Sequence, residues 1–539
     1  MAPEPSPPDA PGAPGTFLGS LLTRSTRYHR PRAPFCGVGY CTNCLVRVDG
    51  VPNVRACRTA VPPGAKVEVE NAWPSGRFDL LAAFDLAFPN GIDTLHGFRR
   101  PAFATPWFQR VVRRLAGTGT IPSPAVADGV RPGRVVEARS AVIGAGPAGR
   151  ACAERLVAGG ERPVLLEREP TVRPVPGAEM FSGTTAVFLP PPLEGRAHRF
   201  ELIASRSDGS ALSVRTDRVI VAVGGYDASL WFAGSDRPGV LTAEGAERLS
   251  SPASPRFGHA LVFGGGNRAL AILERFGASV DAIVAPGIIA PELARRASEL
   301  DVPLYPRTLL LGAVGRRKVQ KVRLVRRGGE APPFEVDADA VILAHRRLPH
   351  PQLFFQAGAR TFWRPDVGAY GPVAGPGGAT TVPGLYAAGE VAGASEVEDA
   401  RRSGEAVAEA LVGGVPWSAP VAAGPSEAHH ELEGYYQELL SVGPGPGKVV
   451  VCPCEDVLLP ELLDATDRGY RGIEVIKRYT GVGTGLCQGR YCLPEALLVL
   501  AQRERRPVPE VGYITQRPPV VPTALGAFAG LPESEGSAP

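Results

Sequence analysis

Apolar and polar residues alternate with different periods along the chain, and the changes of period predict its elements. From Ser140 the apolar run "SAVIGAG" leads into "PAGRACAERLVAG" and then into a second apolar run, "RPVLLERE". This order of strand, glycine-rich turn, helix and strand is typical of a βαβ unit with a parallel sheet. A second unit of this kind is predicted by "HALVFGGGNRALAILERFGASVDAIVAP". The segments "DADAVILAH" and "TTVPGLYAAGEVAG" are then expected to return as the closing strand and helix of the first unit.

Shorter periods predict two smaller units at the ends of the chain. Strict alternation in "CLVRVDG" and "AKVEVEN" predicts two strands near the N-terminus, and the later segments "LLPELLDATDRG" and "IEVIKRYTGVG" have a helical period. The resulting division is a disordered leader (1–15), a ferredoxin-like domain (16–80), a wrapping linker (81–137), the first part of an FAD-binding domain (138–257), a second nucleotide-binding-like domain (258–338), the second part of the FAD-binding domain (339–415), a linker (416–448), a C-terminal iron–sulfur domain (449–510) and a tail (511–539).

Composition narrows the function classes. The chain has 539 residues, too many for one core, and its net charge of +4 gives no reason to expect nucleic acid or an anionic membrane as partner. Its apolar runs are shorter than the roughly 18 residues of a membrane span, and the N-terminus does not have the pattern of a secretory signal. We therefore expect the cytoplasm, where thiols stay reduced. Eight of the nine cysteines form two clusters, which in a reducing compartment indicates metal or redox chemistry.

The first cysteine cluster has the spacing C-x4-C-x2-C-x12-C, formed by Cys36, Cys41, Cys44 and Cys57. This spacing is that of plant-type [2Fe–2S] ferredoxins, and glycines inside the loop permit the tight wrap around such a cluster. Structural zinc is the alternative, but zinc sites favour paired short spacers, which the x4 loop does not match.

The first glycine-rich turn carries the dinucleotide fingerprint G-x-G-x-x-G. Gly144 permits the tight turn, Gly146 lets a pyrophosphate approach the backbone, and Gly149 lets the helix pack on the strand. Glu167 ends the next strand and is placed to accept the ribose hydroxyls. The closing "GLYAAGEVAG" favours FAD over NAD. The candidate FAD-binding residues are Gly144, Gly146, Pro147, Ala148, Gly149, Glu167, Gly224, Gly389 and Glu390.

The second glycine-rich turn is a weaker candidate for nucleotide binding, through Gly264 and Gly266. Its following strand ends in Ala285 and Pro286, where NAD would need an acid and NADP an arginine. NAD(P) therefore stays a secondary candidate, and the alternative is a turn that keeps the Rossmann-like fold but binds no ligand.

The second cysteine cluster consists of a C-x-C pair, Cys452 and Cys454, and a C-x4-C pair, Cys487 and Cys492. Cys492 directly precedes a helical segment, whose N-terminal dipole suits an anionic thiolate cluster. The spacing resembles the [2Fe–2S] domain of bacterioferritin-associated ferredoxin, and zinc is again the alternative.

Several long segments resemble the alpha subunit family of heterotetrameric sarcosine oxidase, hydrogen cyanide synthase, opine oxidase and D-hydroxyproline dehydrogenase. They are "YHRPRAPF", "GVPNVRAC", "VEVENAWPSGRFDL", "VIVAVGGYDASLWFAGSDRPGVL", "CPCEDV", "GYRGIEVIKRYTGVGTGLCQGRYC" and "RPPVVPTALGAFAG". The resemblance implies an α/β flavoprotein with two Rossmann-like dinucleotide-binding domains, an N-terminal β-grasp ferredoxin-like domain and a small helical C-terminal iron–sulfur domain. The family's "GGQ" segment is missing, and about fifty residues separate Glu167 from "RVIVAVGG" where the family has more than a hundred.

The resemblance also implies a function. It implies FAD, two [2Fe–2S] clusters, and a partner beta subunit resembling D-amino-acid oxidase that takes hydride from a small amine or imino acid. The chain is then expected to pass electrons from this partner to an external acceptor, without a membrane span or nucleic acid. The alternatives are an NAD(P)H-dependent ferredoxin-type reductase and a non-catalytic scaffold with a degenerate Rossmann fold.

Overall fold

The computed structural model describes residues 22–62, 64–91, 102–107, 129–251, 256–328, 331–415, 430–443 and 447–532. The predicted disordered leader (1–15) and parts of both predicted linkers and of the tail lie outside these residues. The chain forms two compact units. Unit 1 comprises Met1–Ala127, Asp227–Arg346 and His429–Ile514, and unit 2 comprises Asp128–Tyr226, Arg347–Ala428 and Thr515–Pro539.

Unit 2 is built on a seven-stranded sheet in the order β8-β7-β6-β11-β10-β9, with β24 paired to β11. Strand β11 is parallel to β6 and β24 and antiparallel to β10. The strands are β6 (Arg134–Ile143), β7 (Val164–Leu166), β8 (Glu179–Phe181), β9 (Thr184–Phe188), β10 (Phe200–Arg206), β11 (Ala211–Val221) and β24 (Leu385–Ala387). The prediction that "GLYAAGEVAG" closes the first unit is therefore confirmed, because β24 lies in this segment.

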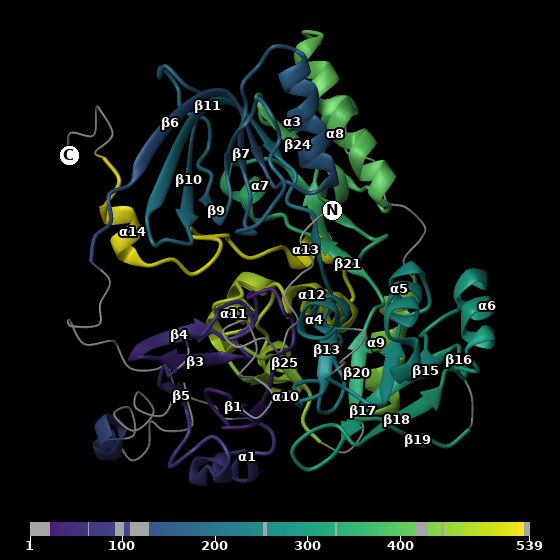
Figure 1. The fold of residues 1–539 in the computed structure, drawn as a ribbon. Helices are drawn as coiled ribbons and strands as arrows, with labels where there is room; N and C mark the ends of the chain where they lie inside the picture. Colours follow the sequence, from purple (N-terminus) through teal and green to yellow (C-terminus); the bar gives the residue numbers. More distant parts are fainter. Residues whose placement is uncertain are drawn as a thin grey trace. The chain divides into compact units, whose positions relative to one another are not determined.

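Two helices of unit 2, α3 (Pro147–Ala158) and α8 (Val397–Val412), lie side by side along the sheet (Figure 1). They approach closely because a Cβ added at Gly404 would lie 2.0 Å from the Ala148 carbonyl oxygen. Cys152 on α3 is fully buried in the core that these helices share. The remaining elements are β12 (Gly225–Asp227), which pairs with β21 (Arg347–Pro349), then α7 (Gln352–Gln356), β22 (Thr361–Arg364), β23 (Ala369–Pro372) and α14 (Leu525–Ala529).

The second Rossmann-like unit lies in unit 1. Its parallel five-stranded sheet has the order β13-β20-β14-β15-β16, and a smaller antiparallel sheet has the order β17-β18-β19. The elements are β13 (Val240–Thr242), α4 (Ala243–Leu249), β14 (Ala260–Phe263), α5 (Asn267–Phe276), β15 (Val280–Val284), α6 (Pro291–Glu299), β16 (Leu304–Tyr305), β17 (Thr308–Val314), β18 (Lys321–Arg326), β19 (Phe334–Asp337) and β20 (Ala340–Leu343).

One expectation about the connectivity is wrong. The segment "DADAVILAH" forms β20, which pairs with β13 and β14 and so belongs to the second sheet rather than to the first. A fully buried run of four apolar residues fits the centre of either parallel sheet, and only the long-range pairing decides between them. The second sheet therefore begins before residue 258 and ends after residue 338, because β13 and β20 both belong to it.

The two cysteine-rich segments also lie in unit 1. The first surrounds a three-stranded sheet of β3 (Leu45–Val48), β4 (Val51–Arg55) and β5 (Val67–Val69), beside the pair β1 (Thr23–Arg24) and β2 (Pro31–Arg32) and the short helix α1 (Ala83–Ala87). The second consists of β25 (Val450–Cys452), β26 (Val457–Leu458), α10 (Leu459–Asp467), α11 (Ile473–Thr480), α12 (Leu493–Glu504) and α13 (Val508–Val511), preceded by α9 (His430–Val442). The strands and helices predicted from the alternating and helical periods are confirmed here.

Candidate functional site: two buried cysteine sets and a dinucleotide turn

The first cysteine set consists of Cys36, Cys41, Cys44 and Cys57, all buried and none in a disulfide. Hydrogen bonds link Cys36 to Cys41 and Cys57, and Cys57 to Cys44. The loop can turn around the thiols because Gly37 and Gly39 have φ values of +65° and +77°, which other residues rarely adopt. The fold therefore brings together the four thiols that the sequence predicted as cluster ligands.

The charges of these thiols depend on one another. Burial by itself would raise the pKa of Cys36, but hydrogen bonds from Cys41 and Cys57 outweigh it and hold this pKa well below its ordinary value. The hydrogen bond to Cys36, together with burial, raises the pKa of Cys41 well above its ordinary value. Backbone N–H groups also point at the sulfurs, and that of Cys41 lies 3.4 Å from Sγ of Cys36. The pKa of Cys57 is raised in the same way, so hydrogen bonding within the set favours the thiolate at Cys36 and the thiol at Cys41 and Cys57.

The second cysteine set consists of Cys452, Cys454, Cys487 and Cys492, which are also buried and free of disulfides. Hydrogen bonds pair Cys454 with Cys487 and Cys452 with Cys492. The hydrogen bond from Cys454 lowers the pKa of Cys487 to about 7. Cys492 is the N-cap residue of α12, as the sequence predicted, so the positive end of the helix dipole lies at this set.

Gly485 leaves space beside the thiols of the second set. A Cβ added at Gly485 would lie 2.3 Å from Cβ of Cys454 and 3.4 Å from its Sγ. A side chain at this position would therefore occupy the space beside the sulfur.

Each cysteine set supplies the donors that a [2Fe–2S] cluster needs. Such a cluster takes four cysteine ligands, two on each iron, and each set contains four buried thiols. Zinc sites favour paired short spacers, which the C-x4-C-x2-C loop of the first set does not match. The first set therefore fits a [2Fe–2S] cluster better than structural zinc, and the donor chemistry of the second set fits such a cluster as well.

The first glycine-rich turn of unit 2 has the geometry that a dinucleotide needs. Cβ atoms added at Gly144 and Gly149 would lie 2.4 Å from the Ala222 carbonyl oxygen and 1.8 Å from the Gly144 carbonyl oxygen. A Cβ at Gly146 would meet nothing within 4 Å, so the backbone there is open to an incoming phosphate. The turn leads directly into α3, which starts at Pro147 and Ala148 and whose N-terminus favours an anion.

Glu167 lies at this turn, as the sequence predicted. Its Oε2 accepts a hydrogen bond of 2.7 Å from the N–H of Ala145, and its Oε1 accepts one of 2.8 Å from the N–H of Glu169. Each oxygen keeps a further lone pair for a ribose hydroxyl. The backbone of the turn therefore holds the carboxylate in one orientation beside the open face at Gly146.

The closing turn of unit 2 contains Gly389 and Glu390. A Cβ at Gly389 would lie 2.8 Å from Cβ of Ala148, so the glycine lets the closing turn approach the first helix. Arg347, which the sequence interpretation missed, donates to Oε1 of Glu390 at 2.7 Å, and the Cβ of a residue at Gly225 would overlap this carboxylate. Gly224, with a φ of +69°, is the other predicted residue that faces Glu390. The available signal was the arginine pair in "AHRRLPH", within four residues of the end of the buried strand β20.

The second glycine-rich turn keeps the Rossmann-like fold, but its polar side chains form contacts within the protein. Gly264 packs against the Ala344 carbonyl, whereas a Cβ at Gly266 would meet nothing within 4 Å. Arg268, at the start of α5, forms ion pairs with Asp227 and Glu247 and is therefore engaged inside unit 1. Strand β15 ends before Ala285 and Pro286, so no acid stands where a ribose would be bound.

Comparison with known proteins identifies the class. Three family models match the chain: the 2Fe–2S iron–sulfur cluster binding domain over residues 18–72, the pyridine nucleotide-disulphide oxidoreductase domain over 194–414, and the sarcosine oxidase A3 domain over 447–531. The chain is therefore an oxidoreductase that joins a 2Fe–2S domain to an FAD-binding flavoprotein domain. The second model begins after Gly149, so the role of the first turn rests on its geometry.

The chain is a relative of the subunits that the sequence resembled. It is 26% identical to an opine oxidase subunit of Agrobacterium tumefaciens, over 73% of this chain and 92% of that protein. It is 27% identical to the sarcosine oxidase alpha subunit of Rhizobium meliloti, over 95% of this chain and 55% of that protein, so it spans about half the length of this relative. The resemblance stated from the sequence is confirmed.

A shorter match has higher identity. Over 45 residues, which are 8% of this chain and 39% of that protein, the chain is 56% identical to hydrogen cyanide synthase subunit HcnA of Pseudomonas aeruginosa.

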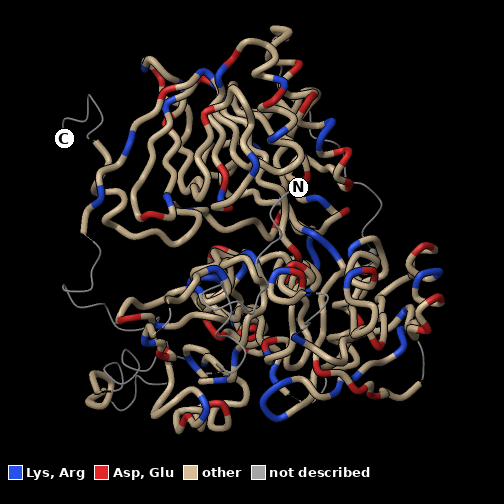
Figure 2. The backbone as a smooth tube through the Cα atoms, viewed as in Figure 1, with Lys and Arg blue, Asp and Glu red and all other residues tan. Residues whose placement is uncertain are grey.

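A solved structure confirms the fold class. L-proline dehydrogenase from P. horikoshii superposes with a TM-score of 0.66 at 18% identity, covering 96% of this chain and 94% of that one. Within the described residues, no helix is long and apolar enough to cross a membrane. Figure 2 shows basic and acidic residues interspersed along both units, in agreement with the small net charge.

Proposed function

We propose that the chain is the electron-transferring flavoprotein and iron–sulfur subunit of a heteromeric amine or imino-acid dehydrogenase or oxidase. The observation that carries this proposal is the presence of two complete, buried sets of four thiols in a chain that also has a dinucleotide turn. Eight buried thiols that are free of disulfides and form two sets of four suit two one-electron centres.

The residues proposed to hold FAD are those of the first turn and of the closing turn. Gly144, Gly146 and Gly149 shape the phosphate site, with Pro147 and Ala148 at the helix N-terminus. Glu167 orients a ribose, and Gly389 lets the closing turn approach α3. FAD, when bound, accepts two electrons as hydride and releases them singly. Gly224 and Glu390 complete the site, and the ion pair with Arg347 fixes the Glu390 carboxylate beside it.

The proposed partner is a beta subunit resembling D-amino-acid oxidase, which oxidises the small amine or imino acid. The relatives carry the word "subunit" in their names, which supports a partner for this chain as well. Electrons then leave through the two iron–sulfur sites to an external acceptor. The proposed location is the cytoplasm, because a reducing compartment keeps cluster-forming thiols free.

The test is co-expression with the product of the adjacent gene, followed by a screen of amines and imino acids with an artificial dye acceptor. We expect dye-linked turnover from the complex and none from the isolated chain. Turnover by the isolated chain would contradict the partner model.

Two variants sharpen this test. In the complex, Cys41→Ser should remove one of two cluster signals, lower iron from about four to about two per chain and reduce turnover with FAD still bound. Cys152→Ala is the matched control, since this buried cysteine lies in neither set and its removal should leave iron and turnover unchanged. Equal turnover in Cys41→Ser and the native chain would mean that this set is not on the electron path.

A further inference from the structure

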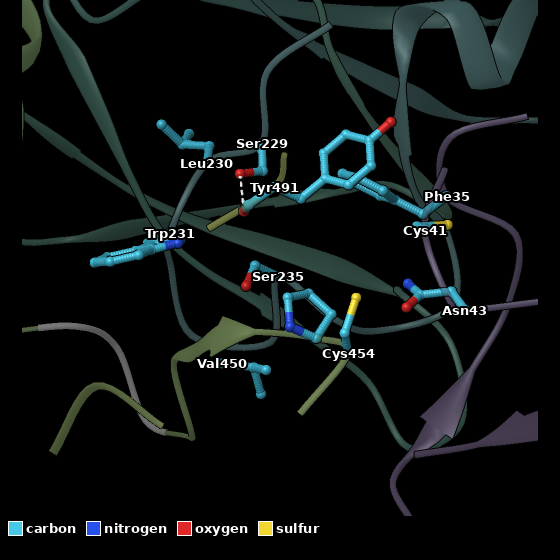
Figure 3. A pocket seen from close by; sticks show the side chains of 11 residues that line it. Phe35, Cys41, Asn43, Ser229, Leu230, Trp231, Ser235, Val450, Cys454 and Tyr491 are labelled. Atoms are coloured by element: carbon cyan, nitrogen blue, oxygen red, sulfur yellow. Dashed lines mark hydrogen bonds between the residues drawn. The ribbon is translucent and has the colours of Figure 1, made fainter. Parts of the chain in front are cut away.

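The two cysteine sets, which are far apart in sequence, lie against each other inside unit 1. Cys41 of the first set and Cys454 of the second line the same small pocket, together with Phe35, Asn43 and Tyr491 (Figure 3). The two side chains enter this pocket from the N-terminal and the C-terminal parts of the chain. The pocket therefore marks the place where the two candidate iron–sulfur sites meet.

The two ligand loops interlock through their aromatic and basic side chains. The ring of Phe35, next to Cys36, contacts the ring of Tyr491, next to Cys492, edge to face with 5.3 Å between centroids. The Arg490 guanidinium lies over the Tyr40 ring, with its Cζ 4.7 Å from the centroid. Each contact joins a residue adjacent to a cysteine of the first set to a residue within two positions of Cys492.

Thr42 provides the shortest connection between the sets. It follows Cys41 directly in the chain and lines a second small pocket together with Cys454, where its hydroxyl acts as a hydrogen-bond donor that lowers the pKa of the Cys454 thiol. When Cys454 serves as a thiolate ligand of a cluster, a hydrogen bond donated by this hydroxyl would stabilise the negative charge on its sulfur. One residue of backbone and one hydrogen bond therefore link a ligand of the first set to a ligand of the second.

A buried ion-pair network fixes this arrangement. Asp456, two residues after Cys454 and fully buried, accepts hydrogen bonds from the N–H groups of Arg27 and Tyr28 at 2.8 and 3.1 Å. Arg32, on β2, forms ion pairs with Asp456 and with Asp236, and all three side chains are almost completely buried. Since a buried charge without its partner is costly, the two segments are held in one relative position.

We propose that Thr42 is a positioning residue that couples the two iron–sulfur sites, so that they exchange electrons directly with each other. One electron leaves the reduced cluster at one set and reduces the oxidised cluster at the other, and no bond is made or broken and no proton moves. This inference rests on the proposed function only in requiring that both sets hold clusters; it is independent of substrate and partner.

The test uses the full-length chain with both clusters, reduced stepwise with dithionite and followed by electron paramagnetic resonance. In the native chain we expect the signal of the fully reduced protein to be broadened or split by magnetic interaction between the two centres. Thr42→Val removes the hydroxyl at nearly constant volume and should lower the reduction potential of one cluster, because a hydrogen bond to sulfur favours the reduced, more negative cluster. Thr42→Ser keeps the hydroxyl and should restore the native potential.

The matched control is Thr484→Val in the loop of the second set. The Thr484 hydroxyl donates to the Gly481 carbonyl at 2.7 Å, so its removal should leave both potentials unchanged. Equal potentials in Thr42→Val and Thr484→Val, or two clusters whose signals simply add, would overturn the inference while the proposed function stands. A chain that holds only one cluster would overturn both, and iron analysis with the visible spectrum identifies that outcome.

Discussion

At the scale of single residues, two glycines of the first turn, Gly149 and Gly146, differ in the space around them. Gly149 has no room for a Cβ because the Gly144 carbonyl lies against it, so it serves helix packing. Gly146 has open space in front of it and an extended backbone with a φ of −69°, which any residue can adopt. Folding therefore does not require a glycine at residue 146, whereas the close approach of a pyrophosphate to the backbone does.

This difference predicts that Gly146→Val folds but loses its flavin. The valine side chain would occupy the space of the phosphate without meeting protein atoms, so the thermal midpoint of the apoprotein should stay native. The flavin content of the purified chain should fall about tenfold or more, which corresponds to a loss of at least about 1.4 kcal/mol of flavin binding free energy. Absorbance of bound flavin and a thermal melt measure both quantities.

Gly266→Val is the matched control in the second turn, where a Cβ also meets nothing within 4 Å. Its flavin content should remain native. Loss of flavin in Gly266→Val alone would assign the flavin to the second turn and overturn the proposed site.

At the scale of elements, the short pair β1–β2 is held by buried ion pairs as well as by the apolar packing of Tyr28 against Val450 and Leu458. Arg30 donates to Asp236 at 2.7 Å and also pairs with Asp85, which in turn pairs with Lys448 at 2.8 Å. Burial alone would raise the pKa of Asp236, but Arg30 and Arg32 hold it well below its ordinary range. The carboxylate is therefore charged in the folded protein at every ordinary pH.

The depressed pKa of Asp236 predicts an acid-dependent stability of unit 1. Its contribution is fully present above the unfolded pKa of about 3.9 and is lost as the pH falls from there toward the lower folded pKa. Asp236→Asn should leave the buried arginines without their counter-charge and cost about 3–5 kcal/mol at neutral pH. Urea unfolding between about pH 3 and pH 7 measures this, with a smaller slope below pH 4 expected for the variant.

Asp337→Asn is the control for this prediction, because Asp337 is exposed and lies 3.8 Å from Lys321. An exposed pair contributes only about 0–1 kcal/mol, so this variant should unfold at nearly the native urea concentration. The same loss of stability in both variants would show that the buried network around Asp236 has no special role.

At the scale of the whole molecule, the chain interleaves its two units: the N-terminal segment, a middle segment and a C-terminal segment together form unit 1. Both cysteine sets and the second Rossmann-like sheet share this unit, whereas the candidate FAD turn belongs to unit 2. The proposed iron–sulfur sites and the proposed flavin site thus belong to different compact units of one polypeptide.

This organisation predicts how the isolated chain responds to NADH. Because β15 is followed by Ala285 and Pro286, and Arg268 is held by Asp227 and Glu247, the second turn should not bind a pyridine nucleotide productively. Anaerobic addition of NADH or NADPH should leave the flavin band of the isolated chain unbleached, while dithionite bleaches it. Rapid bleaching by NADH would support the NAD(P)H-dependent ferredoxin-type reductase instead.

The sequence by itself determined the parts that depend on near neighbours. The spacing within each cysteine set, the order strand, glycine turn and helix, and the acid that ends the next strand all lie within a few dozen residues. Such patterns reflect local geometry, namely the tight turn that Gly144 permits and the loop that Gly37 and Gly39 close, so they predicted the candidate ligands and the fold class.

Only the tertiary structure decided which distant segments meet. It assigned "DADAVILAH" to the second sheet, paired Arg347 with Glu390, and brought Thr42 to Cys454 across more than four hundred residues. No spacing rule predicts these contacts, because they depend on the summed pairing and burial of whole elements rather than on the residues next to them. The cysteine spacing therefore predicted two separate candidate iron–sulfur sites, and the fold brings one cysteine of each to a shared pocket.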